Sequence, residues 1–182
     1  PANPIEVRDY AFDRVGDIHS RAAIPRLWPL VGRTGCTASG CTPANKLDKR
    51  LRWRAGELVL SLGGPSIIEQ FSQRLPSASG IQYEPEELEG YATRMSQMTP
   101  PPTSTVTALL DSQLWWNRVV ALRYLERRGG EPDVPAMKRL MSDEVEVSGE
   151  GWSELNPPVK KVGQVADAAI KALRTREHGD ER

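Results

Sequence analysis

The sequence predicts an all-α fold built as an array of about four helical repeats. Apolar residues recur at spacings of three and four over long segments, which is the period of one helix face. An alanine also returns at the same point of each pattern, at Ala11, Ala55, Ala121 and Ala166. A glycine break follows this alanine in the first three segments. Together these observations predict stacked pairs of helices.

The first repeat, residues 5–44, is the reference for the others. Its first helix should place one apolar face inward, and Gly16 should end that helix. Ser20 is the expected N-cap of the second helix, and Pro25 is tolerated in that helix's first turn. The inward face of the first helix is expected to consist of Val7, Ala11, Val15 and Ile18.

Three later units repeat this frame, at residues 45–103, 104–157 and 158–176, before a charged tail at 177–182. Breaks at Gly63-Gly64 and Gly129-Gly130 separate the helices of the second and third units. The fourth unit keeps only its first helix. The array is therefore expected to form a single domain.

The repeated frame carries a family resemblance. Arg52 and Arg118 repeat Arg8, and Asp133 to Ala136 repeats Ala23 to Arg26. The pattern covers about two thirds of the chain and resembles the HEAT-repeat family, in the bacterial phycocyanobilin-lyase-type form. The resemblance implies a right-handed α-solenoid, in which each repeat mainly contacts its neighbours. The matching reference residues are Val7, Arg8, Ala11, Val15, Gly16 and Ala23 to Pro25.

The links between repeats are longer than this family usually has. They run from Gly32 to Asn45, from Pro76 to about Thr103, and from Ser142 to Pro158. The second link includes a predicted helix in the segment EPEELEGYATRMSQM. Because the links occupy the same place in each repeat, we expect them to emerge along one edge of the solenoid. Such insertions often form the binding surface.

Charge is balanced overall and uneven along the chain. The formal net charge of zero argues against a general nucleic-acid or membrane-surface binder. Residues 1–75 carry 11 Lys and Arg against 7 Asp and Glu, residues 76–110 carry 1 against 4, and residues 111–182 carry 12 against 13. Acidic partner-binding candidates in the second and third links are Glu84, Glu86, Glu87, Asp143, Glu144 and Glu146. The alternative is that these carboxylates are solvated loop residues.

Basic and aromatic residues give further candidates for partner contact. Lys49, Arg50 and Arg52 lie near the start of a predicted helix, where cations oppose the helix dipole and therefore favour an acidic partner or ligand. The alternative is an exposed helix face. Trp115, Trp116 and Trp152 are the aromatic candidates, because exposed tryptophan is a preferred binding anchor. Packing of these rings in the core or against a link is the alternative.

Cys36 and Cys41 lie in the first link, in a Gly/Thr/Ser-rich loop. The loop is flexible enough to bring both thiols into disulfide geometry. A bridge favours an oxidising compartment, so we expect an exported protein, periplasmic or surface-associated, with the cytoplasm as the alternative. Free thiols and a metal site remain the other interpretations, although the loop offers no histidine to complete a zinc shell.

We find no catalytic constellation, cofactor motif or metal motif in the sequence. His19 and His178 lack the partners of an iron or zinc site, and Gly63-Gly64-Pro65 lacks the Lys-Ser/Thr of a phosphate loop. No run of about 18 apolar residues predicts a membrane span. Since the chain begins at Pro1 without Met, we expect it to be part of a longer polypeptide.

The predicted function is a non-catalytic module that binds a partner protein through its enlarged links or concave face. It is expected to belong to a larger exported bacterial protein. One alternative is a HEAT-type enzyme, either a bilin lyase or a DNA alkylpurine glycosylase. A neutral chain does not favour the glycosylase, which needs a basic groove. Another alternative is a regulatory or targeting domain attached to an enzyme in the same polypeptide.

Overall fold

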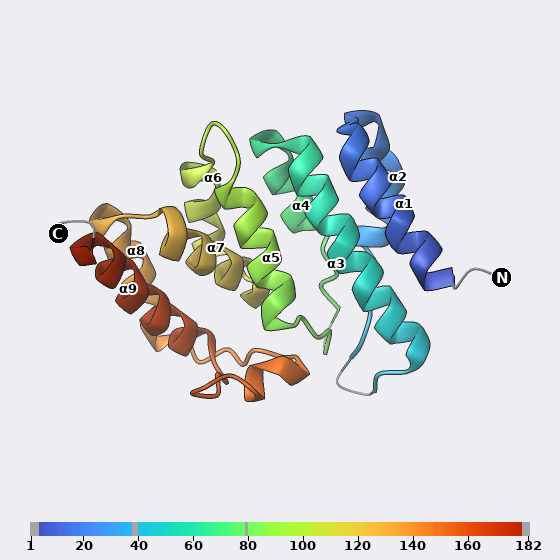
Figure 1. The fold of residues 1–182 in the computed structure, drawn as a ribbon. Coiled ribbons are helices and arrows are strands. Elements are labelled where there is room, and N and C mark those ends of the chain that lie inside the picture. The colour runs from blue at the N-terminus through green and yellow to red at the C-terminus, as the bar shows by residue number, and fades with distance from the viewer. Residues whose placement is uncertain (1–3, 38–39, 79, 180–182) are drawn as a thin grey trace. The chain divides into compact units, whose positions relative to one another are not determined.

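The computed structural model describes residues 4–37, 40–78 and 80–179 (Figure 1). Helices dominate this part of the chain, and it contains no β-strand, only isolated bridges such as Glu146 with Lys161. The prediction of an all-α fold is therefore confirmed. None of the described helices is long and apolar enough to cross a membrane.

The chain divides into two compact units, residues 1–81 and residues 82–182. The division falls inside the second enlarged link, residues 76–103, and therefore inside the predicted repeat 45–103. The segment predicted as one repeat thus contributes to both units. The expectation of a single domain stays a prediction, and each unit is described below by itself.

Unit 1 contains two helix pairs. The first pair is α1 (Pro4–Ile18) and α2 (Ile24–Val31), and the second is α3 (Pro43–Gly63) and α4 (Ile68–Arg74). Both α1 and α2 pack against α3, which also contacts α4. Thr42 begins α3 with a capping box, in which its hydroxyl accepts a hydrogen bond from Asn45 N at 3.2 Å. Gly64, with a φ of 66°, ends it, as the sequence predicts.

The end of α1 differs from the prediction. Gly16 lies inside the helix, which continues to Ile18, and His19 takes the left-handed conformation beyond it with a φ of 50°. Gly16 instead lies close to α3, because a Cβ at this position would be 3.3 Å from Leu58 Cδ2. Ser20 precedes a 3₁₀ turn, Arg21–Ala23, rather than α2, and its side chain makes no capping hydrogen bond.

The predicted inward face of α1 is also wrong in part. Among the α1 side chains that the structure describes, Phe12 is buried, whereas Ala11 is exposed and Ile18 is 66% exposed. The side chain of Val7, also predicted to face inward, lies outside the described part. The equivalent alanines of α3, α7 and α9 (Ala55, Ala121 and Ala166) are all fully buried. The small-residue position therefore marks close helix packing in three of the four copies, and in α1 it faces a hollow instead.

Unit 2 contains two further helix pairs and a final helix. These are α5 (Pro85–Ser96) with α6 (Thr103–Ala108), α7 (Trp115–Arg128) with α8 (Val134–Lys138), and α9 (Val162–Gly179). Figure 1 shows α7 between α5 and α9, and both contacts are extensive. Val119, Ala121, Leu122 and Leu125 of α7 are buried in this core. The predicted break at Gly129-Gly130 is confirmed.

The second enlarged link, residues 76–103, contains one helix, and a second helix begins where the link ends. The helix predicted in EPEELEGYATRMSQM is confirmed as α5, and α6 follows it before α7 begins. Ala92 of α5 is fully buried, like the alanines of α3, α7 and α9. The long step between Ala55 and Ala121 thus contains an additional pair with the same small-residue packing. The repeated pattern misses it because Ser96 and Thr99 stand where the pattern has its two later apolar anchors.

Candidate functional site

The third link, residues 142–158, is anchored to unit 2 by a buried aromatic cluster. The rings of Tyr83 and Trp116 stack with centroids 4.9 Å apart, and Trp115 meets Trp152 edge to face at 6.2 Å. Trp152 Nε1 donates a hydrogen bond to Tyr83 O at 2.8 Å. The exposed fractions of Trp115, Trp116 and Trp152 are only 9%, 5% and 2%. These rings are therefore packed in the interior of unit 2, which is the alternative to exposed binding anchors.

Backbone contacts secure the same link against the start of α5. Tyr83 N donates to Ser148 O at 2.8 Å, and Gly151 N donates to Glu84 Oε2 at 2.8 Å. Gly149 permits this approach, since a Cβ on it would lie 2.5 Å from Tyr83 O. Link and helix are therefore in contact over several residues, and the link has a defined position within unit 2.

The beginning of the third link is tied to α7 by an ion pair. Arg118 Nε lies 2.8 Å from Asp143 Oδ2, and their side chains are only 8% and 12% exposed. Arg118 Nη1 also donates to Ser112 O at 2.6 Å. Low exposure weakens screening by water, so each charge depends on the other. Asp143 thus has a structural partner within the chain.

A cleft of about 680 Å³ lies between the third link and α9. We call it the link cleft. Its apolar lining comes from the turn before the link, from the link, from Val159 just after it and from α9. Of the residues that the structure describes, three cations and three anions also line it. The apolar residues are Met141, Leu155, Pro157, Pro158, Val159 and Ala168, and the charged ones are Arg123, Asp143, Glu144, Lys161, Asp167 and Lys171.

Several wall charges pair across or along the cleft. Lys161 Nζ forms a close ion pair with Glu144 on the link, and Lys171 Nζ lies 2.6 Å from Asp167 on α9. The hydrogen bond and the charge of Glu144 raise the pKa of Lys161 above its ordinary value of 10.5. All four side chains are at least 43% exposed, so a ligand in the cleft has access to them.

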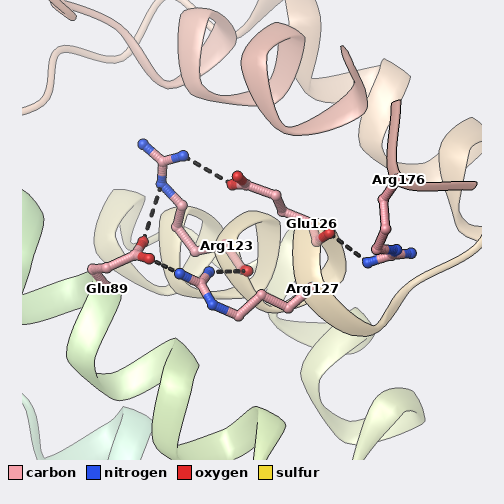
Figure 2. Close-up of polar contacts among 5 residues, drawn as sticks. All are labelled: Glu89, Arg123, Glu126, Arg127 and Arg176. Carbon is pink, nitrogen blue, oxygen red and sulfur yellow. Dashed lines mark hydrogen bonds and ion pairs between the residues drawn. The ribbon is translucent and has the colours of Figure 1, made fainter. Parts of the chain in front are cut away.

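Arg123 connects the link cleft to a network of charged residues on α5, α7 and α9. Figure 2 shows Glu89 between Arg123 and Arg127, with Glu126 on the other side of Arg123. Arg123 Nε lies 3.5 Å from Glu89, and its Nη1 lies 2.9 Å from Glu126. Arg176 of α9 donates to the backbone O of Glu126 at 2.6 Å. The three helices are thereby linked through one set of polar contacts.

Burial changes the electrostatics of this network. Desolvation lowers the pKa of Arg127 below its usual range, although an arginine remains charged at neutral pH. Glu89 compensates that charge as its ion-pair partner, and Arg127 Nη1 also donates to Arg123 O at 2.7 Å. The network therefore fixes Arg123, which carries one of the cations at the link cleft.

The predicted acidic residues separate into two groups. Glu84 and Glu87 are buried, Glu87 accepts a hydrogen bond from Tyr91 Oη at 2.8 Å, and Asp143 pairs with Arg118. Glu86, Glu144 and Glu146 are exposed, and Glu144 lines the link cleft. Of the six predicted acidic residues, three are therefore exposed and available to a partner, and the other three make contacts within unit 2.

The predicted basic residues lie in unit 1. Arg52 is fully buried, and its Nη1 donates to Thr34 O at 2.6 Å, so it holds the first link in place. Lys49 is partly buried, and Arg50 is exposed. Of the three, Arg50 alone presents an exposed side chain, whereas Arg52 is a structural residue in this conformation.

The first link contains the predicted cysteine pair. Cys36 and Cys41 lie at disulfide distance, with their Cα atoms 4.6 Å apart, and Cys36 is 1% exposed. No group of three or more potential metal ligands occurs among the described residues. His19 lies exposed in the turn after α1, with its Nδ1 2.9 Å from Asp17 O, and the side chain of His178 lies outside the described part.

Comparison of the chain with protein-family models, curated proteins and solved structures finds no match.

Most residues of the link cleft were not predicted from the sequence. Its residues come from four separate segments, and only Asp143 and Glu144 were among the candidates. One local signal was available: Asp167 and Lys171 are four residues apart, which places them together on a helix face. Their position opposite the third link depends on how that link folds back, and no spacing encodes it.

Proposed function

We propose that the protein is a non-catalytic protein-interaction module built from HEAT-like repeats, and that its link cleft receives an extended segment of a partner protein. The observation that carries this proposal is the composition of the cleft. Cations and anions are balanced around an apolar lining. A peptide offers apolar side chains, charges of both signs and backbone hydrogen-bonding groups, so it complements all three features.

Other classes of ligand fit this cleft less well. A nucleic acid would need an excess of cations, because its phosphates dominate the binding energy. The cleft instead has three anions for its three cations.

The exposed ion pairs of the link cleft cost little to rearrange, since such pairs contribute about 0–1 kcal/mol each. A partner segment can therefore replace Glu144 or Asp167 as the counter-charge of a lysine.

The cellular setting is part of the same proposal. We place the module outside the cytoplasm, as one part of a larger exported bacterial polypeptide. The cysteine pair at disulfide distance supports this placement, since such bridges persist in oxidising compartments. The enlarged links support a binding role, because one of them forms a wall of the cleft.

The test is selection of binding peptides from a random phage-displayed library on the intact protein. Selected peptides are then titrated by fluorescence polarisation against the wild type and Ala168→Trp. Ala168 is exposed and lines the cleft, so the indole fills space there without entering the core. We expect Ala168→Trp to weaken peptide binding about tenfold or more, which corresponds to about 1.4 kcal/mol.

Ala108→Trp is the matched control, because Ala108 is an exposed alanine of α6 outside the cleft lining. It should bind the peptides as the wild type does. Failure of any peptide to be enriched, or equal binding by Ala168→Trp, would refute the proposal for this cleft. Circular dichroism of both variants confirms that they are folded.

A further inference from the structure

Unit 1 contains a hollow whose chemistry differs from that of the link cleft. Its volume is about 650 Å³, and it lies between α1, α2 and α3. Phe12, Leu27 and Leu51 form its buried apolar walls, and Ala11 and Ala44 lie exposed at its edge. We call it the unit 1 hollow. Small-molecule sites in proteins have volumes of about 300–1,000 Å³ and are mostly apolar, so its size and lining fit that class.

Among the described residues, the polar part of this lining is one ion pair. Arg33 Nη1 contacts Asp48 Oδ1, and both residues line the hollow. The side chain of Arg33 is 42% exposed. A guanidinium has five N–H donors in a planar fork, and the contact with Asp48 engages one of its nitrogens. Donors therefore remain for a ligand carboxylate, which pairs well with arginine.

Arg33 is held in place from two directions. Its side chain is fixed by Asp48, while Arg52 Nη1 reaches the carbonyls of Arg33 and Thr34 at 3.4 and 2.6 Å. Arg52 is fully buried, so it forms a rigid support under the start of the first link. A cation fixed before binding loses less conformational freedom when a ligand arrives.

The charge of unit 1 favours an anion at this position. Residues 1–81, which form unit 1, carry 11 Lys and Arg against 7 Asp and Glu. Such an excess creates a positive potential that raises the local concentration of anions. An apolar hollow with a cation at its edge in a positive unit is complementary to a molecule with a hydrocarbon body and one anionic head.

We propose that the unit 1 hollow binds a small amphipathic anion, a medium- to long-chain carboxylate, with its chain along the walls and its carboxylate on Arg33. Burial of the chain contributes about 25 cal/mol for each Å² removed from water. The charge-assisted hydrogen bonds to Arg33 orient the head group. This activity is independent of peptide binding at the link cleft, because it uses other residues and another ligand class.

Calorimetric titration of the full chain with decanoate and with neutral 1-decanol tests the proposal. We expect saturable binding of one decanoate. Arg33→Gln should weaken decanoate binding about tenfold or more while changing 1-decanol binding by less than about twofold, since only the anion uses the charge. Asp48→Asn should strengthen decanoate binding, because the amide oxygen can still accept a hydrogen bond from Arg33 and hold its side chain, while the negative charge that competes for Arg33 is removed.

Two alanine variants locate the chain of the ligand. Ala11→Trp fills the hollow and should weaken both ligands about tenfold or more. Ala22→Trp is its control, because Ala22 is exposed in the turn before α2 and does not line the hollow. Ala44→Trp repeats the blockade from α3 in case Ala11→Trp does not fold, as judged by circular dichroism.

Several outcomes would overturn the proposal. They are non-saturable binding, equal binding by the variants that fill the hollow, and equal weakening of decanoate and 1-decanol by Arg33→Gln. Loss of library-selected peptides on Ala11→Trp, without decanoate binding to the wild type, would assign the hollow to a partner protein instead. Ala168→Trp should leave decanoate binding unchanged, so failure at one site is distinguishable from failure at the other.

Discussion

Two arginines in the same register perform related tasks in the two units. Arg52 and Arg118 each lie three residues before a fully buried alanine, Ala55 or Ala121. Arg52 donates to Thr34 O of the first link, and Arg118 pairs with Asp143 of the third. A long cationic side chain reaches beyond the helix and satisfies loop carbonyls or carboxylates there. The repeated arginine thus anchors the first and third enlarged links.

Asp143→Asn should destabilise unit 2 by about 3 kcal/mol, because Arg118 would stay largely buried without its counter-charge. Asparagine keeps the shape of the side chain, so the loss reports the charge. Urea denaturation followed by circular dichroism measures the change. Asp167→Asn is the control, since it removes an exposed ion pair with Lys171 and should cost less than about 0.5 kcal/mol. Equal losses in the two variants would contradict the assigned role of Arg118.

At the scale of elements, the positions of the helices were predicted from the sequence better than the segments that pack against them. The breaks at Gly64 and Gly129 follow from the conformations that end helices, and the segment that forms α5 was recognisable from its pattern. The error at Gly16 arose because glycine serves two purposes. In α1 it permits close approach to Leu58, while His19 supplies the left-handed conformation.

The candidate site was less predictable than the helices, because it depends on contacts between distant segments. Trp152 and Tyr83 are joined by a hydrogen bond although they lie 69 residues apart. That contact holds the third link beside the start of α5, while Val162 N and Gly163 N at the start of α9 donate to Val145 O and Asp143 O of the link. Glu84 and Glu87 lie in an acidic segment, which is typical of a charged surface. They are buried instead, where they accept hydrogen bonds from Gly151 N and Tyr91 Oη, and the charge pattern does not reveal these contacts.

The ion pair between the third link and Lys161, the residue before α9, can be tested by titration. Glu144→Gln should lower the pKa of Lys161 toward its ordinary value of 10.5, because the hydrogen bond and charge that raise it come first from Glu144. Reductive ¹³C-methylation with NMR measures that pKa.

The sign of the linkage follows from the direction of the shift. A raised pKa in the folded state adds stability that is fully present below pH 10.5 and is lost as the pH rises through the raised value. An unchanged Lys161 pKa in Glu144→Gln would show that the ion pair does not form in solution.

At the scale of the whole molecule, the cysteine pair relates the fold to its surroundings. Protein purified without reductant should resist alkylation under denaturing conditions and accept two labels after reduction, as intact mass shows, because both cysteines lie at disulfide distance. Cys36→Ser with Cys41→Ser should cost about 2 kcal/mol, a small value because the closed loop is short. Two labels before reduction would refute the bridge and remove the main support for an exported location.

The aromatic cluster also gives the molecule an optical property. Trp115 has its ring centroid 5.8 Å from Trp116 and 6.2 Å from Trp152. Indoles at such separations couple their electronic transitions, so the cluster should produce a strong near-ultraviolet dichroic signal. One of the three chromophores belongs to the third link and the other two to α7. Any movement of that wall of the link cleft therefore changes the coupling, and the protein carries a spectroscopic reporter of the cleft without an added label.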